Sequence, residues 1–116
     1  MSVPVTILEG ESLSNAVDLG IGEAIVGVLM PGNGGGPGQW TTADITFQAS
    51  LDGVTFRDVY TSTGVELALA VVDGGVVAFF SQLIGLPPIV KVRSGTAATP
   101  VAQSATQVVT LLTQAR

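Results

Sequence analysis

The chain has 116 residues, of which only 11% are charged and 47% are hydrophobic, and its formal net charge is −5. With four basic side chains it lacks the clustered cations that binding to nucleic acid or to an acidic membrane surface requires. It contains neither histidine nor cysteine, which excludes Ser-His and Cys-His nucleophile systems, disulfides and the usual zinc and copper ligand sets.

The length predicts one domain over residues 1–116. The N-terminal residues lack a basic start followed by an apolar stretch, so we expect no signal peptide. No apolar run approaches the roughly 18 residues of a membrane-spanning helix. The low charge leaves much neutral surface, which favours a protein that is covered by neighbours in an assembly.

The first third of the chain predicts three extended segments. Residues 3–8 alternate between apolar and polar and predict a strand, and residues 12–19 predict a second strand or extended segment. Residues 24–30 (AIVGVLM) are apolar on both faces, which is typical of a central or interface strand. Gly27, in the middle of this run, predicts a bulge or the close approach of another backbone.

Residues 31–39 (PGNGGGPGQ) predict a flexible loop, because five glycines and two prolines cannot hold a helix or a central strand. The loop lacks the Gly-Lys-Ser/Thr ending of a phosphate-binding loop. Trp40, directly after it, is expected to cap one end of the core; an exposed Trp40 would instead suit stacking on a sugar ring. Residues that could contact a neighbouring subunit from this loop are Asn33, Gly35 and Trp40.

Residues 40–60 predict a β-hairpin around Asp52-Gly53, a pair that suits a tight turn. In the first strand Ile45, Phe47, Ala49 and Leu51 alternate with Asp44, Thr46, Gln48 and Ser50, so the apolar set faces the core. The return strand places Val54 and Phe56 on one face, and we expect Phe56 to meet Phe47 inside the protein.

The second half of the chain predicts further short strands separated by turns. The expected segments are 65–72 (strand or short helix), 76–80 (strand), 81–85 (short helical turn), 89–93 (strand) and 105–113 (strand). Val90 and Val92 are expected to point inward and Lys91 and Arg93 outward. The complete pattern of roughly eight strands predicts an all-β, antiparallel sandwich or small barrel.

The acidic residues give no catalytic or metal-binding signature. Asp44, Asp52 and Asp58 lie close in sequence, but Asp52 is better explained as a turn former. No Asp-x-Asp-x-Asp spacing predicts calcium binding, so we expect no cofactor, no metal and no enzymatic activity. The cations Arg57, Lys91 and Arg93 are expected on solvated faces or in ion pairs with Asp58 and Glu66.

Four segments together carry a family resemblance over residues 6–112. They are residues 7–20 (ILEGESLSNAVDLG), 26–31 (VGVLMP), 40–60 (WTTADITFQASLDGVTFRDVY) and 90–96 (VKVRSGT). As a set they resemble small structural proteins encoded near the capsid genes of tailed bacteriophages, of the head decoration or cement type. The chain differs from the family pattern by the insertion GNGGGPGQ between Pro31 and Trp40.

The resemblance implies a single-domain β-sandwich of jelly-roll type, a place on the outer surface of the virion capsid after synthesis in the host cytoplasm, and no catalytic residues. The expected partners are the major capsid protein and further copies of the chain, with a homotrimer as the expected assembly. The two strands that are apolar on both faces predict its interface, at Ile25, Val26, Val28, Met30, Val108 and Leu112. The alternatives are a carbohydrate-binding module of a phage fibre or adhesion structure and a tail or neck structural protein.

Overall fold

The computed structural model describes residues 2–20, 22–32, 38–78 and 87–115. In these residues it contains eight β-strands and no helix. The strands are β1 (Ser2–Ile7), β2 (Val17–Asp18), β3 (Glu23–Leu29), β4 (Ile45–Ser50), β5 (Arg57–Asp58), β6 (Val76–Ala78), β7 (Ile89–Ser94) and β8 (Gln107–Ala115). They form two four-stranded antiparallel sheets, so the predicted all-β, antiparallel sandwich of about eight strands is confirmed.

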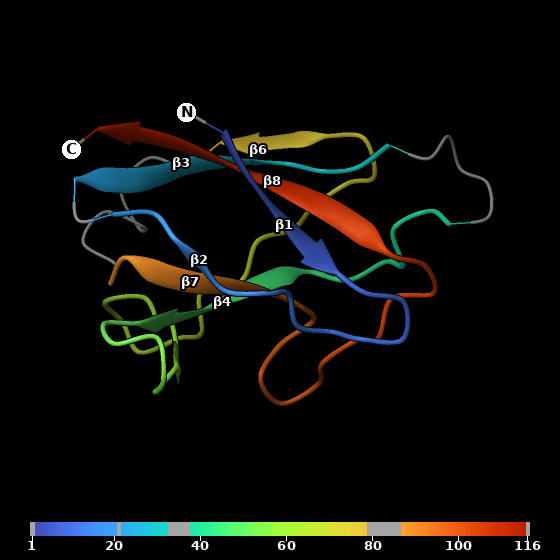
Figure 1. Cartoon of the computed structure of the whole chain (residues 1–116). Helices are drawn as coiled ribbons and strands as arrows, with labels where there is room; N and C mark the ends of the chain where they lie inside the picture. The colour runs from blue at the N-terminus through green and yellow to red at the C-terminus, as the bar shows by residue number, and fades with distance from the viewer. Residues whose placement is uncertain (1, 21, 33–37, 79–86, 116) are drawn as a thin grey trace.

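The strands pair from the two ends of the sequence inward. β1 pairs with β8, β2 with β7, β3 with β6 and β4 with β5. Two further pairings, β3 with β8 and β4 with β7, complete the sheet orders β1-β8-β3-β6 and β2-β7-β4-β5. Figure 1 shows the sheets as two layers, with β1, β8, β3 and β6 above β2, β7 and β4.

In the described residues, the core between the two layers consists mainly of branched aliphatic side chains, together with Phe47, Trp40 and Met30. Along each strand the inward residues alternate with residues on the outer face, as the pleat of a strand requires. The apolar residues of the described chain that are at most 1% exposed are Val5, Ile7, Val28, Ile45, Phe47, Val90, Val92, Val109 and Leu111. Each contributes about 1.5–3 kcal/mol by burial. The predicted inward positions of Val90 and Val92 are therefore confirmed.

The β4–β5 hairpin is real but wider than predicted. Six residues, 51–56, separate the two strands, whereas the sequence predicted a tight turn at Asp52-Gly53. Val54 is 84% exposed and Phe56 is only half-buried, so the predicted contact of Phe56 with Phe47 in the core is wrong. The cause is that Val54 and Phe56 lie in the loop and not in a strand, so their side chains do not follow the alternation of inner and outer faces.

Gly27 lies where the sequence predicted an irregularity. The register of β3 against β8 shifts between Ile25 and Gly27, as in a β-bulge. A Cβ atom at position 27 would lie 2.9 Å from the backbone oxygen of Val77, so β6 approaches β3 too closely for any side chain there. Both readings of this glycine, a bulge and a close backbone approach, are confirmed.

Other predicted segments are shorter than expected. Within residues 12–19 only Val17–Asp18 form a strand. Residues 65–72 form no strand, although isolated bridges join Glu66 to Tyr60 and Leu69 to Ile45. Residues 76–78 of the predicted strand 76–80 form β6, whereas residues 79–80 and the segment 81–85 lie outside the described residues.

Candidate interaction surfaces

The outer face of the β1-β8-β3-β6 sheet carries no charge over its centre. The four strands contain one charged residue, Glu23, at the first position of β3. Glu23 lies two residues before the inward-facing Ile25, so it belongs to the inner side of the sheet and not to the outer face. We give the name uncharged face to eight outward positions over the centre of the sheet. Its residues are Pro4, Thr6, Val26, Leu29, Val76, Val108, Thr110 and Leu112.

The strand register places these side chains in continuous rows. One row crosses all four strands, from Pro4 through Thr110 and Leu29 to Val76, because each residue is the register partner of the next. Leu29, Val76 and Val108 are 41%, 60% and 46% exposed. Contiguous exposed apolar side chains of this kind are unusual on a monomer and mark interaction sites.

The free edge of this sheet at β1 is closed to further strands. The Thr6 N–H donates to the side-chain oxygen of Asn15 at 2.8 Å, and the Asn15 N–H donates to the Thr6 carbonyl at 3.3 Å. Pro4 lies two residues before Thr6, so its backbone faces the same free edge but has no N–H to offer. Both features prevent edge-to-edge pairing. The β1 edge of this sheet is therefore unsuited to pairing with a strand of a neighbour, and its outer face is the candidate contact surface.

The outer face of the other sheet, β2-β7-β4-β5, is polar and centred on one buried cation. Its strands contain five charged residues: Asp18, Arg57, Asp58, Lys91 and Arg93. Arg93 is 6% exposed although it points outward, because acidic side chains from two other segments cover it. Lys91 lies beside it with its Nζ atom 4.4 Å from the centre of the Phe56 ring, a cation–π contact.

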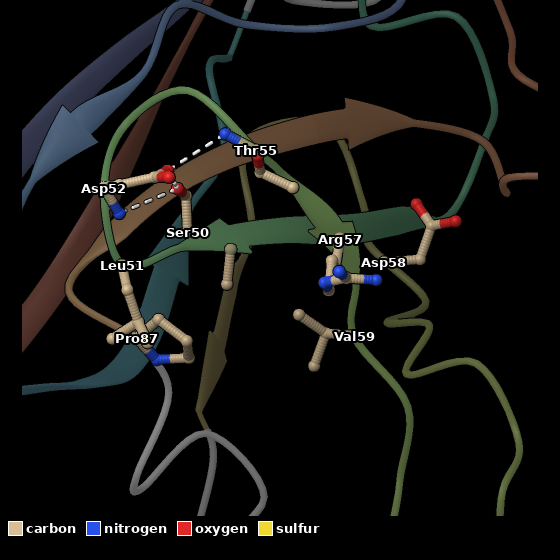
Figure 2. Close-up of a pocket in the computed structure, with 9 residues that line it drawn as sticks. Ser50, Leu51, Asp52, Thr55, Arg57, Asp58, Val59 and Pro87 are labelled. Atoms are coloured by element: carbon tan, nitrogen blue, oxygen red, sulfur yellow. Dashed lines mark hydrogen bonds between the residues drawn. The ribbon is translucent and has the colours of Figure 1, made fainter.

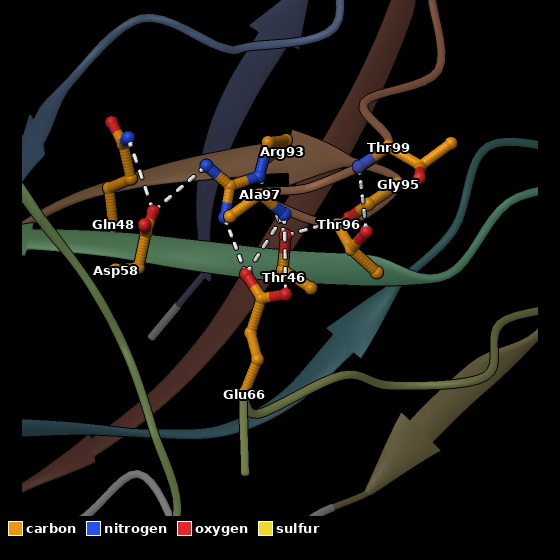
Figure 3. Close-up of polar contacts among 9 residues, drawn as sticks. All are labelled: Thr46, Gln48, Asp58, Glu66, Arg93, Gly95, Thr96, Ala97 and Thr99. Atoms are coloured by element: carbon orange, nitrogen blue, oxygen red, sulfur yellow. Dashed lines mark hydrogen bonds and ion pairs between the residues drawn. The ribbon is translucent and has the colours of Figure 1, made fainter. Parts of the chain in front are cut away.

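The Arg93 guanidinium joins three parts of the chain (Figure 3). Its NH1 group donates to Asp58 in β5 at 2.9 Å and its NH2 group to Glu66 at 2.7 Å. Its Nε donates at 3.0 Å to the hydroxyl of Thr46, which donates in turn to the Gly95 carbonyl at 2.7 Å. Thr46 is consequently buried, although the alternation of β4 puts it on the outer face. The predicted ion pairs are confirmed for Arg93 with both acids.

A pocket of about 490 Å³ opens beside the β4–β5 hairpin (Figure 2). Its lining combines apolar and polar side chains: Ala49, Ser50, Leu51, Asp52, Thr55, Arg57, Asp58, Val59 and Pro87. Ala49 and Arg57 are register partners on neighbouring strands, so their side chains leave the sheet on the same side. The volume falls within the range of small-molecule and peptide pockets.

Asp52 organises the hairpin loop at the rim of this pocket. Its carboxylate accepts the N–H groups of Val54 and Thr55 at 2.8 and 2.9 Å and the Ser50 hydroxyl at 2.9 Å. These bonds, with the backbone N–H of Thr55 first, then that of Val54 and then the Ser50 hydroxyl, lower the pKa of Asp52 from 3.8 to about 2. Asp52 is thus a turn former, as the sequence predicted, and its Oδ1 atom accepts all three of these hydrogen bonds.

Trp40 is buried at one end of the core, with 4% of its surface exposed. Its indole N–H donates to the Ala43 carbonyl at 3.2 Å and its backbone N–H to Asp73 at 3.2 Å. The predicted capping role is confirmed, and the only tryptophan of the chain offers no exposed ring to a sugar. The other two predicted contact residues, Asn33 and Gly35, lie outside the described residues.

The predicted interface residues divide between the core and the surface. Val26, Val108 and Leu112 lie on the uncharged face. Ile25, Val28 and Met30 are at most 3% exposed and fill the core, so they cannot reach a neighbour. The bulge at Gly27 decides this division, because it shifts the alternation of β3 between Ile25 and Val28.

The described residues show neither of two other kinds of site. Within them, no three acidic side chains gather closely enough to hold a metal ion. The same residues contain no helix that is long and apolar enough to cross a membrane. The chain matches no protein-family model and no curated protein sequence.

Proposed function

We propose that the protein is a non-enzymatic structural component of a tailed-phage virion, a head decoration or cement protein that binds and stabilises the assembled shell. The observation that carries the proposal is the uncharged face, an apolar sheet surface on a protein of net charge −5. An acidic protein can pack against further acidic copies only where its contact surface brings no like charges together. The family resemblance of the sequence supplies the identity of the assembly.

We also propose that the sandwich is a jelly roll. A jelly roll has eight strands in two sheets built from two Greek keys, an architecture that is common in viral capsid proteins. The nested pairing of β1 with β8, β2 with β7, β3 with β6 and β4 with β5 supports this topology, because it is the pattern of one long folded-over ribbon rolled into two sheets. Fold alone does not decide function, so the surface carries the functional proposal.

The proposed mechanism is thermodynamic. A protein that binds the assembled, expanded shell and not its dissociated subunits stabilises the shell by mass action, by about 2.7 kcal/mol per site at a hundredfold excess over Kd. The uncharged face is covered by neighbouring copies in a homotrimer, and the acidic loops keep the free protein in solution. Binding sites for the major capsid protein lie elsewhere on the trimer.

Self-association tests the role of the face directly. We expect an oligomer by analytical ultracentrifugation at micromolar concentration, and we expect Val108→Lys to give a monomer with unchanged circular dichroism. Val54→Lys is the matched control, because Val54 is 84% exposed in the hairpin loop and away from the face. A monomeric wild-type protein, or equal effects of the two substitutions, would contradict the proposed interface.

Capsid binding tests the function itself. Expanded shells of the major capsid protein of the same phage should co-sediment with the wild-type protein and should withstand a higher temperature in its presence. Shells that neither bind the protein nor gain thermal resistance would remove the decoration function, whatever the oligomeric state.

A further inference from the structure

The pocket beside the β4–β5 hairpin contains a cation that has no ion-pair partner among the described residues. Arg57 makes no ion pair with any carboxylate of these residues, which include all nine Asp and Glu side chains of the sequence. Arg93 differs, since its guanidinium binds two carboxylates. In a protein with nine acidic and four basic residues, Arg57 thus lies at a pocket without forming an ion pair.

The two acids that line the pocket form no ion pair with Arg57. Asp52 accepts the Val54 and Thr55 N–H groups and the Ser50 hydroxyl through its Oδ1 atom. Asp58 is bound through its Oδ1 atom by Arg93 at 2.9 Å and by the amide of Gln48 at 3.4 Å. Arg57 is therefore the charged side chain of the lining that has no ion-pair or hydrogen-bond partner among the described residues, and its guanidinium can pair with an anionic group of a ligand.

The other side chains that line the pocket are mostly apolar, so they favour a ligand with an apolar group next to its anionic group. Ala49 and Val59 are buried residues of the lining. Leu51, which is 80% exposed, and Pro87 lie across the pocket from Val59 (Figure 2). Thr55 adds a hydroxyl that makes no hydrogen bond with the described residues and can accept one N–H. An apolar side chain, a carboxylate and an adjacent N–H occur together in the last residue of a polypeptide.

We propose that this pocket binds the C-terminal residue of a partner polypeptide, an apolar residue whose free carboxylate pairs with Arg57. Arginine suits this task because its planar guanidinium donates two parallel hydrogen bonds to one carboxylate. The apolar side chain packs between Leu51, Val59 and Pro87, and the last N–H of the polypeptide donates to Thr55. The pocket belongs to the sheet opposite the uncharged face, so it is separate from the proposed self-association.

The test is an NMR titration of the ¹⁵N-labelled protein with the dipeptide N-acetyl-Ala-Leu and with its C-terminal amide. We expect saturable shifts of signals from Leu51, Thr55, Arg57 and Val59, with the free acid binding about three- to tenfold more tightly than the amide, in proportion to one charge-assisted hydrogen-bonded pair. This difference should shrink in 0.5 M salt, because the arginine is exposed.

Two variants locate the interaction. Arg57→Gln should bind acid and amide equally while keeping the wild-type spectrum elsewhere. Lys91→Gln removes the same charge from the opposite face of the sheet and should retain the wild-type preference.

Three results would overturn the proposal: no saturable shifts at 20 mM dipeptide, equal affinity of the wild type for acid and amide, or equal losses in the two variants. Tighter binding of octanoate than of the dipeptide would assign the pocket to free aliphatic acids instead. None of these results affects capsid binding or self-association, so the two proposals fail independently.

Discussion

The outer faces of the two sheets differ in how their side chains find partners. On the β2-β7-β4-β5 sheet the polar groups satisfy one another within the chain, with Arg93 bound to two acids and Lys91 placed over Phe56. On the β1-β8-β3-β6 sheet the exposed Leu29, Val76 and Val108 have no such cover. The comparison teaches that the polar groups of one face are satisfied within the monomer, whereas the apolar side chains of the other face stay exposed in it, as the proposed self-association requires.

Removal of Arg93 should have the largest effect on the monomer. Arg93→Ala leaves the partly buried Asp58 and Glu66 facing each other without their shared cation, at a cost of about 2–4 kcal/mol in the free energy of unfolding. Lys91→Ala, on the same face, should cost less than about 1 kcal/mol. Urea denaturation of both variants measures the difference, and equal losses would show that the Arg93 contacts do not hold the face together.

A methyl group at Gly27 tests the packing of the other sheet. The added Cβ would meet the Val77 backbone oxygen at 2.9 Å and the Leu112 side chain at 3.3 Å, so β6 must shift away from β3. We expect Gly27→Ala to cost about 1–3 kcal/mol by overpacking. Gly22→Ala is the control, because nothing lies within 4 Å of its Cβ position. Thermal unfolding of the two variants should separate them clearly.

Acid should weaken the hairpin loop through Asp52. Because the pKa of Asp52 is lowered from 3.8 to about 2 in the folded protein, its ionised form stabilises the fold above pH 3.8, and this contribution is lost as the pH falls toward 2. In Asp52→Asn this pH-dependent contribution is missing. The stabilities of the variant and the wild type should therefore differ most near neutral pH and converge near pH 2, as measured by denaturation at several pH values. A difference that stays constant with pH would contradict the assignment.

The smallest effect on stability is expected at Pro4. Its nitrogen faces the free edge of β1, so Pro4→Val removes no ladder hydrogen bond and should change the free energy of unfolding by less than about 0.5 kcal/mol. The new N–H nevertheless opens the edge to another strand, so light scattering should report faster aggregation. Thr110→Val adds apolar surface to the same sheet without an edge donor. If it aggregates equally fast, apolar surface rather than the open edge is responsible.

The sequence predicts which side chains face the core where apolar and polar residues alternate, but not where both faces of a strand are apolar. The predicted core positions of Ile45, Phe47 and Ala49 are confirmed, because their polar neighbours mark the opposite face. The same prediction is wrong for Leu51, which is 80% exposed because β4 ends at Ser50. In residues 24–30 both faces are apolar, so only the bulge at Gly27 determines that Val28 lies inside and Val26 outside.

Burial of polar groups depends on partners that are distant in sequence. Arg93 is buried by Glu66, which lies 27 residues away, and no local pattern reports this contact. The predicted two-residue turn at Asp52-Gly53 is wrong because the Asp52 carboxylate accepts N–H groups farther along the chain and so holds a longer loop. The pocket escaped prediction for the same reason, since Pro87 joins it from a separate segment.

The nested pairing of the strands has a consequence for synthesis in the cell. Ser2 pairs with Leu112, and the other five residues of β1 also pair with residues of β8. Because these partners are far apart in sequence, the contact order is high, and folding is expected on the millisecond-to-second scale. At about 5–20 residues per second, the ribosome needs about 5–20 s to add the 110 residues that separate Ser2 from Leu112. During that interval the apolar side chains of Val3, Val5 and Ile7 are without their partner strand, and the missing N–H of Pro4 limits the wrong strands that this segment can join.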